Sequence, residues 1–208
     1  MNNAGIEVLV FDLGNVLVDF DHTIAAERIS RFCDKSPKEI YDLFFASEAT
    51  VLFEEGKISP QDFYLKVKEM LNLRLNYDSF APIWNEIFFL SAKNRAVYSL
   101  INKLRDSYKT ALISNINILH YEYLKKHFPV FNVFHKVFTS FELGAVKPGH
   151  EIYKKTLNIL GVEPQNVFYT DDRAELIESA KNLGIKSFHF VSIEQLKIDL
   201  LNSGVSIN

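Results

Sequence analysis

The sequence has almost no cysteine and no long apolar run. Its 208 residues include one cysteine, Cys33, in a segment predicted to be helical, so no disulfide can form within the chain and a reducing compartment is expected. No stretch approaches the roughly 18 consecutive apolar residues that a membrane-spanning helix needs. The amino terminus lacks the basic start of a signal peptide, and Asp12 interrupts its apolar run. We therefore expect a soluble, cytoplasmic protein.

The sequence also lacks a marked excess of charge of either sign. Lysine and arginine number 23, and aspartate and glutamate number 26, which gives a formal net charge of -3. Nucleic-acid-binding proteins usually carry a basic patch, and none stands out here. We therefore expect neither nucleic acid nor a membrane as a partner, while both a monomer and a homodimer stay open.

Five short apolar runs predict buried strands. They cover residues 6–11, 110–113, 136–139, 167–169 and 187–191. Continuous apolar runs are typical of strands that are covered on both faces of a sheet. Because segments of helical pattern separate the runs, they predict an α/β fold with a doubly wound parallel sheet.

The long gap between the first two runs predicts an insertion. We assign residues 1–18 and 89–208 to a core domain and residues 19–88 to a small helical cap. The cap segment holds three or four helical patterns and no convincing strand.

Serines mark several predicted helix starts. Ser36 and Ser59 are each followed by proline, a combination typical of the first residues of a helix. Ser91 likewise predicts the start of a core-domain helix that continues through Asp106.

Polar side chains follow four of the predicted strands. In chain order they are Asp12, then Ser114 and Asn115, then Lys147, then Asp171 and Asp172. Ligands of an open parallel sheet bind at the carboxyl ends of the strands, so these side chains are expected to share one crevice. Clustered carboxylates repel one another unless a cation joins them, and their oxygens suit Mg²⁺. A carboxylate can also attack phosphorus, while a lysine and a hydroxyl hold phosphoryl oxygens.

Each of these residues also has an ordinary structural interpretation. Asp12 could be a turn residue, and Lys147 could be a surface lysine. Ser114 and Asn115, or an aspartate after the fourth strand, could cap a helix. All of these interpretations would have to hold independently, so the order of the residues and their positions at strand ends favour a phosphoryl-transfer site.

Four segments of the chain together resemble the haloacid dehalogenase-like superfamily. They read VLVFDLGNVLVD, ALISN, GAVKP and VFYTDDRAELIESAKNLG, and they occur in the order of the superfamily's motifs. A helical cap inserted after the first motif also fits one branch of this superfamily. The resemblance implies a Rossmann-like core and a hydrolase that uses Mg²⁺. It also implies that the enzyme hydrolyses a small phosphorylated metabolite, such as a sugar phosphate, through an aspartyl-phosphate intermediate.

The resemblance implies a role for the residues that would handle the phosphoryl group. Asp12 is expected to be the nucleophile. Ser114 and the backbone N–H of Asn115 are expected to hold the phosphoryl oxygens. Lys147 is expected to hold the phosphate and to orient Asp12.

The resemblance implies a metal site as well. Its expected ligands are the carboxylate of Asp12, the backbone carbonyl of Gly14 and the carboxylate of Asp172. Asp171 is expected to support the site through water or hydrogen bonds.

Gly14 departs from the superfamily's pattern. Most phosphatases of the superfamily carry a second aspartate at this position, which protonates the leaving group and later activates water. Such acid–base help is typically worth about 10²–10⁴-fold in rate. Three explanations are open: a substrate with a good leaving group, a proton donor elsewhere, such as in the cap, or weak or lost activity. We favour the first, because the stretch Asp-Leu-Gly-Asn-Val is similar to that of sugar-1-phosphate phosphatases, whose anomeric leaving group departs easily.

Two other functions also fit the motifs. One is a metal-independent haloacid dehalogenase, against which the pair Asp171 and Asp172 argues, since a site without metal gains nothing from clustered carboxylates. The other is a catalytically weak protein that binds a phosphorylated ligand, and Gly14 is its support.

Several neighbouring polar residues are given ordinary roles. Asp19 and Asp21 are interpreted as solvated carboxylates at the hinge into the cap rather than as replacement acids. His22 and His150 are assigned no role, and Arg173 is expected on a helix surface.

Overall fold

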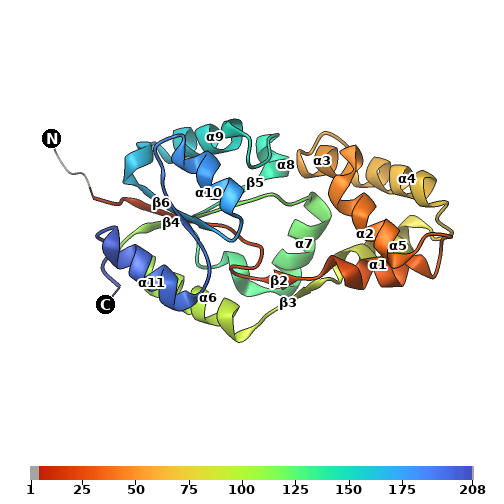
Figure 1. Cartoon of the computed structure of the whole chain (residues 1–208), viewed down its shortest axis with the longest axis horizontal. Helices are drawn as coiled ribbons and strands as arrows, with labels where there is room; N and C mark the ends of the chain where they lie inside the picture. The colour runs from red at the N-terminus through yellow and green to blue at the C-terminus, as the bar shows by residue number, and fades with distance from the viewer. Residues whose placement is uncertain (1–4, 208) are drawn as a thin grey trace.

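A parallel sheet forms the centre of the molecule. The computed structural model describes residues 5–207, and the side chains of all of these except residues 44–46. Within that range the chain forms a five-stranded parallel sheet in the order β5-β4-β1-β6-β7 (Figure 1). Its strands are β1 (Val8–Phe11), β4 (Lys109–Ser114), β5 (Lys136–Thr139), β6 (Val167–Asp171) and β7 (Lys186–His189). The central strand β1 therefore has β4 and β6 as neighbours.

Helices cover both faces of this sheet. They are α6 (Ala92–Leu104), α7 (Ile118–His127), α8 (Ser140–Leu143), α9 (His150–Leu160), α10 (Ala174–Lys181) and α11 (Ile193–Asn202), with 3-10 turns η1 (Pro129–Phe131) and η2 (Pro164–Asn166). Leu9 and Phe11 of β1 belong to the apolar cluster shared with α6 and α11, whereas Val8 and Val10 belong to the cluster shared with α9 and α10. Figure 1 shows these two helical layers above and below the sheet. The prediction of a doubly wound α/β core is confirmed.

The predicted strand at residues 187–191 is shifted. The structure ends β7 at His189, and Val191 is 68% exposed. The backbone N–H of Phe190 still donates to the carbonyl of Asp171, after which the chain turns into α11, capped by Ser192. The apolar run therefore continues for two residues, 190 and 191, after the paired strand has ended.

A helical insertion separates β1 from β4. It consists of α1 (His22–Ser30), α2 (Pro37–Ala46), α3 (Glu48–Glu54), α4 (Pro60–Leu71) and α5 (Tyr77–Asn85). Five helices therefore lie between residues 20 and 88, all of which are within the described backbone, rather than the predicted three or four. The helical insertion has an apolar cluster of its own, around Phe53, Phe63 and Trp84. The domain boundaries at residues 19 and 88 stay a prediction.

Two short strands join the helical insertion to the rest of the chain. β2 (Asp19–Phe20) and β3 (Phe88–Phe89) pair in antiparallel fashion, so the expectation that this segment holds no strand is wrong. Each strand has only two residues, which is too short for an alternating pattern to be recognised in a sequence. This pair of strands holds the segments that enter and leave the helical insertion side by side.

The serines begin helices as predicted. Ser36 and Ser91 accept from backbone N–H groups of α2 and α6 in complete capping boxes, and Ser59 caps α4. The extra helix arises because Ser47, in an extended conformation, ends α2 and caps α3. The helix after Ser91 ends at Leu104 rather than at residue 106.

Two composition-based expectations can be compared with the fold. Cys33 is buried, but it lies beyond the end of α1 rather than in a helix. Among residues 5–207 no helix has both the length and the apolar character that a bilayer crossing requires.

His120 connects the core to the helical insertion. This buried α7 residue donates from Nε2 to the carbonyl of Trp84 at 3.0 Å, and its Nδ1 lies 3.1 Å from the side-chain amide of Asn117. Its ring also stacks on that of Trp84. These partners use one ring nitrogen as a donor and the other as an acceptor, which only the neutral imidazole can satisfy. Burial lowers the pKa of His120 to about 3.

His120 should therefore make the protein sensitive to acid. The unfolded chain takes up a proton near the ordinary pKa of 6.5, whereas the folded protein does so only near 3, so stability is lost as the pH falls below 6.5. This loss is about 1.4 kcal/mol per pH unit. In urea denaturation, His120→Phe is expected to be less stable than the wild type at pH 8 but to lose less stability between pH 6.5 and 4.5. The exposed control His150→Gln should keep the wild-type slope, and parallel curves for His120→Phe and wild type would contradict the account.

Candidate active site

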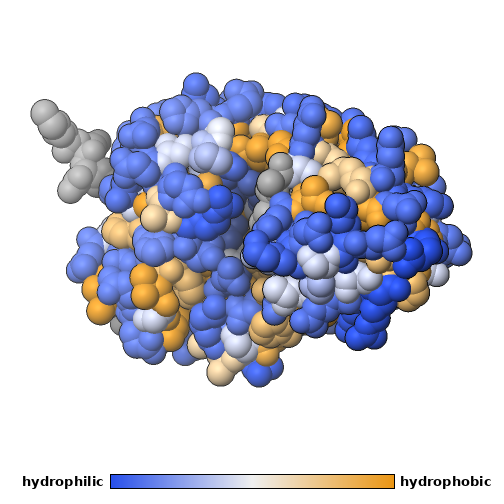
Figure 2. Space-filling model, turned by 45° about the vertical axis from the view of Figure 1, so that its right-hand side comes forward, coloured by the Kyte–Doolittle hydropathy of each residue, from blue (hydrophilic) through white to orange (hydrophobic). Residues whose placement is uncertain are grey.

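The carboxyl ends of β1, β4 and β6 meet at one cavity. It has a volume of about 700 Å³ and lies between the sheet and the helical insertion. Figure 2 shows a recess between these two parts of the molecule, with hydrophilic residues along its rim. All of the predicted site residues line the cavity: Asp12, Gly14, Ser114, Asn115, Lys147, Asp171 and Asp172.

Lys147 lies at the buried base of this cavity. Its Nζ is 2.6 Å from Oδ1 of Asp12 and 2.6 Å from Oδ2 of Asp171, and the side chain is almost completely inaccessible. The same ammonium nitrogen lies 3.2 Å from the carbonyl oxygen of Ile113 and 3.3 Å from the hydroxyl oxygen of Tyr169. The alternative of a surface lysine is therefore wrong. Lys147 joins the ends of β1 and β6 through their carboxylates.

The charges at this base depend on one another. Burial would lower the pKa of Lys147, but the carboxylates of Asp12 and Asp171 outweigh it and raise that pKa, so the ammonium form persists. Burial raises the pKa of Asp12 to about 7, although Lys147 opposes the rise. One lysine therefore compensates the buried carboxylates only in part, and a further cation would favour their ionised form.

The acidic residues fit a divalent cation. Ligand atoms from Asp12, Asp171 and Asp172 all lie within 4.8 Å of one another. Three ionised carboxylates and one ammonium carry two negative charges in excess, which a divalent ion neutralises. Carboxylate oxygens are the hard ligands that Mg²⁺ prefers.

Asp171 and Asp172 have different surroundings. Asp171 is completely buried and accepts hydrogen bonds from Lys147, from the hydroxyl of Tyr169 at 2.5 Å and from the backbone N–H of Arg173 at 3.0 Å. Asp172 is partly exposed and accepts from the side-chain amide of Asn15 at 2.9 Å. Asp172 therefore has more freedom to bind a ligand, while Asp171 is occupied in holding Lys147.

Asn115 holds the backbone of Lys147 in place. Its side-chain amide donates to the carbonyl of Lys147 at 2.8 Å, and its side-chain oxygen accepts from the N–H of Lys147 at 2.8 Å. The hydroxyl of Ser114, at the end of β4, makes only a long 3.5 Å contact with the next carbonyl. Neither residue caps α7, because Asn117 does so.

Gly14 is packed against an aromatic ring. A Cβ atom at this position would lie 2.8 Å from Cε1 of Phe20. An aspartate here would therefore require the Phe20 ring to move. Aromatic packing thus occupies the space beside Gly14.

The neighbouring polar residues fall into two groups. Asp19 is tied to Lys93 at 2.8 Å, and Asp21 caps α1 through the N–H of Thr23. Asp21 and His22 both line the cavity, although the sequence suggested no role for His22. Arg173 also lines the cavity, while its guanidinium pairs with Glu175.

His150 is exposed at the start of α9, outside the cavity lining.

Sequence reasoning missed several contributors to the site. The sequence places Tyr169 in a predicted strand and Glu54 within the predicted cap segment, and assigns neither of them a role. Asn15 gave a usable signal, because an asparagine tolerates the positive φ of 54° that it adopts directly after Gly14. No local pattern identifies the other two, because strand pairing and helix packing bring them to the cavity.

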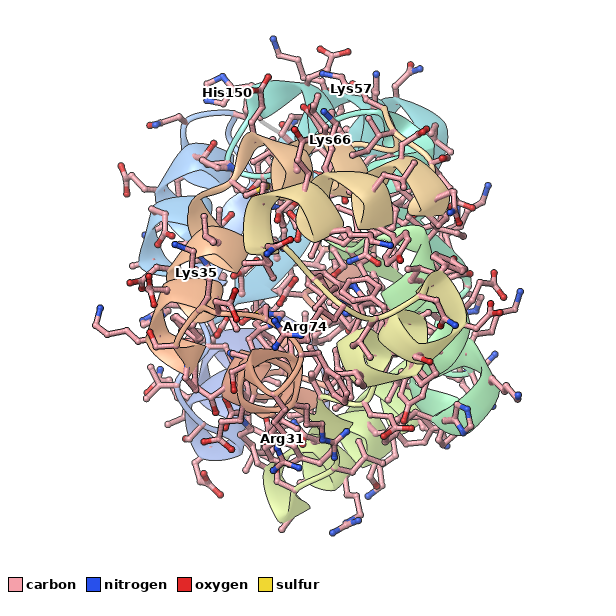
Figure 3. The ribbon with its side chains drawn as sticks, turned by 90° about the vertical axis from the view of Figure 1, so that its right-hand side faces the viewer. Arg31, Lys35, Lys57, Lys66, Arg74 and His150 are labelled. Atoms are coloured by element: carbon pink, nitrogen blue, oxygen red, sulfur yellow. The ribbon has the colours of Figure 1, made fainter. Side chains whose placement is uncertain are left out.

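Apart from Asp21 and Glu54, the helical insertion supplies an uncharged wall. From it, Thr23, Tyr41, Thr50 and Trp84 line the cavity, and among the described lining residues no lysine or arginine comes from α1–α5. Basic residues of this part lie elsewhere: Arg31, Lys35, Lys66 and Arg74 are exposed on the side that faces the viewer in Figure 3.

Known proteins are similar to this chain in sequence and in fold. The chain is 25% identical over 189 residues to D-ribitol-5-phosphate phosphatase of Bacteroides thetaiotaomicron, which covers 88% of this chain and 91% of that protein. A HAD family enzyme of the same organism superposes with a TM-score of 0.82 at 26% identity, covering 93% of this chain and 98% of that one. A structure of a HAD family enzyme from this organism in complex with magnesium and inorganic phosphate gives a TM-score of 0.80 at 27% identity, with 91% and 96% covered.

A model of the haloacid dehalogenase-like hydrolases matches residues 9–190, a range that begins within β1 and ends just after β7. That range contains all of the predicted site residues as well as the helical insertion. The chain therefore belongs to the haloacid dehalogenase-like hydrolase family.

Proposed function

We propose that this hydrolase is a Mg²⁺-dependent phosphatase that acts on the phosphate monoester of a small sugar or polyol, with Asp12 as the nucleophile. The observation that carries the proposal is the ammonium group of Lys147, held between the buried carboxylates of Asp12 and Asp171 beside Asp172. A carboxylate, an ammonium group and a cluster of acidic side chains that fits a metal ion therefore lie together at the floor of one cavity.

Mg²⁺ would be held by Asp12, Asp172 and the backbone carbonyl of Gly14, with Asp171 as a supporting group. When bound, the ion would neutralise the excess negative charge of the cluster and attract phosphoryl oxygens. The magnesium and phosphate found with the similar enzyme of Bacteroides thetaiotaomicron support this assignment.

The residues of the chain can carry out both halves of the reaction. The Asp12 carboxylate forms a bond to phosphorus as the bond from phosphorus to the alcohol oxygen breaks, and that oxygen takes up a proton. Water then attacks the aspartyl-phosphate, which releases inorganic phosphate and restores the carboxylate. Lys147 and Ser114 are positioned to stabilise the phosphoryl oxygens.

The cavity favours a small substrate without a second anionic group. Its volume of about 700 Å³ is within the range of small-molecule sites. Because α1–α5 contribute no cation to the described lining, a second phosphate on that side would lack a partner. The similarity to D-ribitol-5-phosphate phosphatase supports a sugar or polyol monophosphate.

The proposal predicts metal-dependent phosphate release that requires Asp12. With Mg²⁺, phosphate should be released from D-ribitol 5-phosphate or D-glucose 1-phosphate, and a chelator should abolish this release. Asp12→Asn should lower the rate by about 10³-fold or more, because the amide is a poor nucleophile. Asp19→Asn is the matched control, since Asp19 lies outside the cavity lining and pairs with Lys93.

Other outcomes would assign a different function. Halide release from a 2-haloacid in the presence of a chelator, without phosphate release, would identify a metal-independent dehalogenase. Binding of a phosphate analogue without any turnover would identify a phospho-ligand binding protein.

Removal of Lys147 should also destabilise the fold. Lys147→Met leaves two buried carboxylates without their cation, which is expected to cost about 3–5 kcal/mol of unfolding free energy in metal-free urea denaturation. Lys38→Met removes a lysine whose ion pair with Asp42 is exposed, so a change below about 1 kcal/mol is expected. Equal losses of unfolding free energy for the two variants would show that Lys147 does not compensate the negative charge of the buried carboxylates.

A further inference from the structure

Glu54 presents a carboxyl group to the active-site cavity from the opposite side. It is the last residue of α3, and together with Thr50 and Val51 it forms the side of that helix that lines the cavity. Its carboxyl group makes no hydrogen bond or ion pair with any described residue. Lys147 and Arg173 line the same cavity from the side of the sheet.

The end of α3 is fixed against the core. Gly56, two residues after Glu54, adopts a positive φ of 67°, and a Cβ atom there would collide with the carbonyl oxygen of Phe141 in α8. Only glycine allows this close approach. Figure 1 shows α3 and α8 side by side at the junction of the two parts. The position of Glu54 relative to Lys147 is therefore set by backbone packing as well as by its own side chain.

We propose that Glu54 is the general acid that protonates the leaving alcohol, the role for which Gly14 has no side chain. This inference rests on the proposed phosphatase function. It assigns the missing proton donor to the helical insertion, so that a substrate with a poor leaving group can be used as well as one with an anomeric oxygen.

The protonation state of Glu54 suits this role. Burial raises the pKa of its carboxyl group to about 7, although the positive charges of Arg173 and Lys147 oppose the rise. A substantial fraction is therefore protonated at neutral pH and can donate, and the resulting carboxylate can later accept a proton from water.

Other titratable groups of the cavity wall fit less well. Asp21 is engaged by the N–H and hydroxyl of Thr23, which hold the pKa of its carboxyl group below the usual range. Burial lowers the pKa of His22 to about 4, so its imidazole is neutral and carries no acidic proton at neutral pH.

The proton transfer completes the chemistry of the first step. Asp12 bonds to phosphorus, the phosphorus–oxygen bond to the alcohol breaks with its electrons on oxygen, and the proton of Glu54 moves to that oxygen. In the second step, Glu54 takes a proton from the water that attacks phosphorus, so the protein returns to its starting state.

The dependence on leaving group tests this assignment. In single-turnover experiments with Mg²⁺, release of the alcohol from D-ribitol 5-phosphate should fall by about 10²–10⁴-fold in Glu54→Gln, because an alkoxide leaves poorly without a proton. Release of p-nitrophenol from p-nitrophenyl phosphate should change less than about tenfold, because p-nitrophenolate is a weak base that needs little protonation. The first chemical step alone is followed, so slower hydrolysis of the aspartyl-phosphate does not obscure the comparison.

Controls separate this inference from the proposed function. Glu55→Gln removes the adjacent carboxylate, which pairs with Lys57 outside the cavity lining, and should leave both rates unchanged. Equal losses on both substrates in Glu54→Gln, or no loss on either, would overturn the role of Glu54 while the wild-type activity leaves the phosphatase intact. A wild type that releases neither leaving group would overturn the proposed function itself.

Discussion

The buried contact of Lys147 with two carboxylates is the interaction on which the site depends. Asp12 directly follows β1 and Asp171 ends β6, so the ammonium group is held at the junction of adjacent strands. Without a cation between them, two carboxylates in a buried position would strongly disfavour ionisation. Asn115 fixes the backbone of the lysine from β4, the other neighbour of β1. The parallel sheet thus determines where the charged side chains of the proposed phosphoryl site come together.

The two parts of the molecule divide the proposed reaction. The sheet supplies fixed charges that hold and attack the phosphoryl group, while the helical insertion surrounds the leaving group with mostly uncharged residues. Phe20 packs beside Gly14, where the family usually carries an acid, and Glu54 offers a carboxyl group from the facing wall. His120 and the closely packed Gly56 hold the two walls together. In this account, the packing of the helical insertion decides which leaving groups the enzyme can use.

The sequence predicted the parts of the structure that depend on local patterns. Apolar runs indicated the strands, and the residues directly after them indicated the site, because the ends of parallel strands meet in space. Glu54 and Tyr169 could not be identified in this way, since their roles arise from packing between segments far apart in the chain. The same holds for the paired β2 and β3, whose two-residue strands carry no periodicity. The extra helix was missed because Ser47 ends one helix and begins the next.

The most direct test of the account is detection of the covalent intermediate. The wild-type protein would be mixed with Mg²⁺ and p-nitrophenyl phosphate, quenched in acid within the first turnover and analysed by peptide mass spectrometry. The account predicts one added phosphoryl group on the peptide that contains Asp12, at a level that matches the p-nitrophenol released. Release of p-nitrophenol without modification of this peptide, or with the phosphoryl group on another residue, would contradict the assignment of Asp12 as the nucleophile.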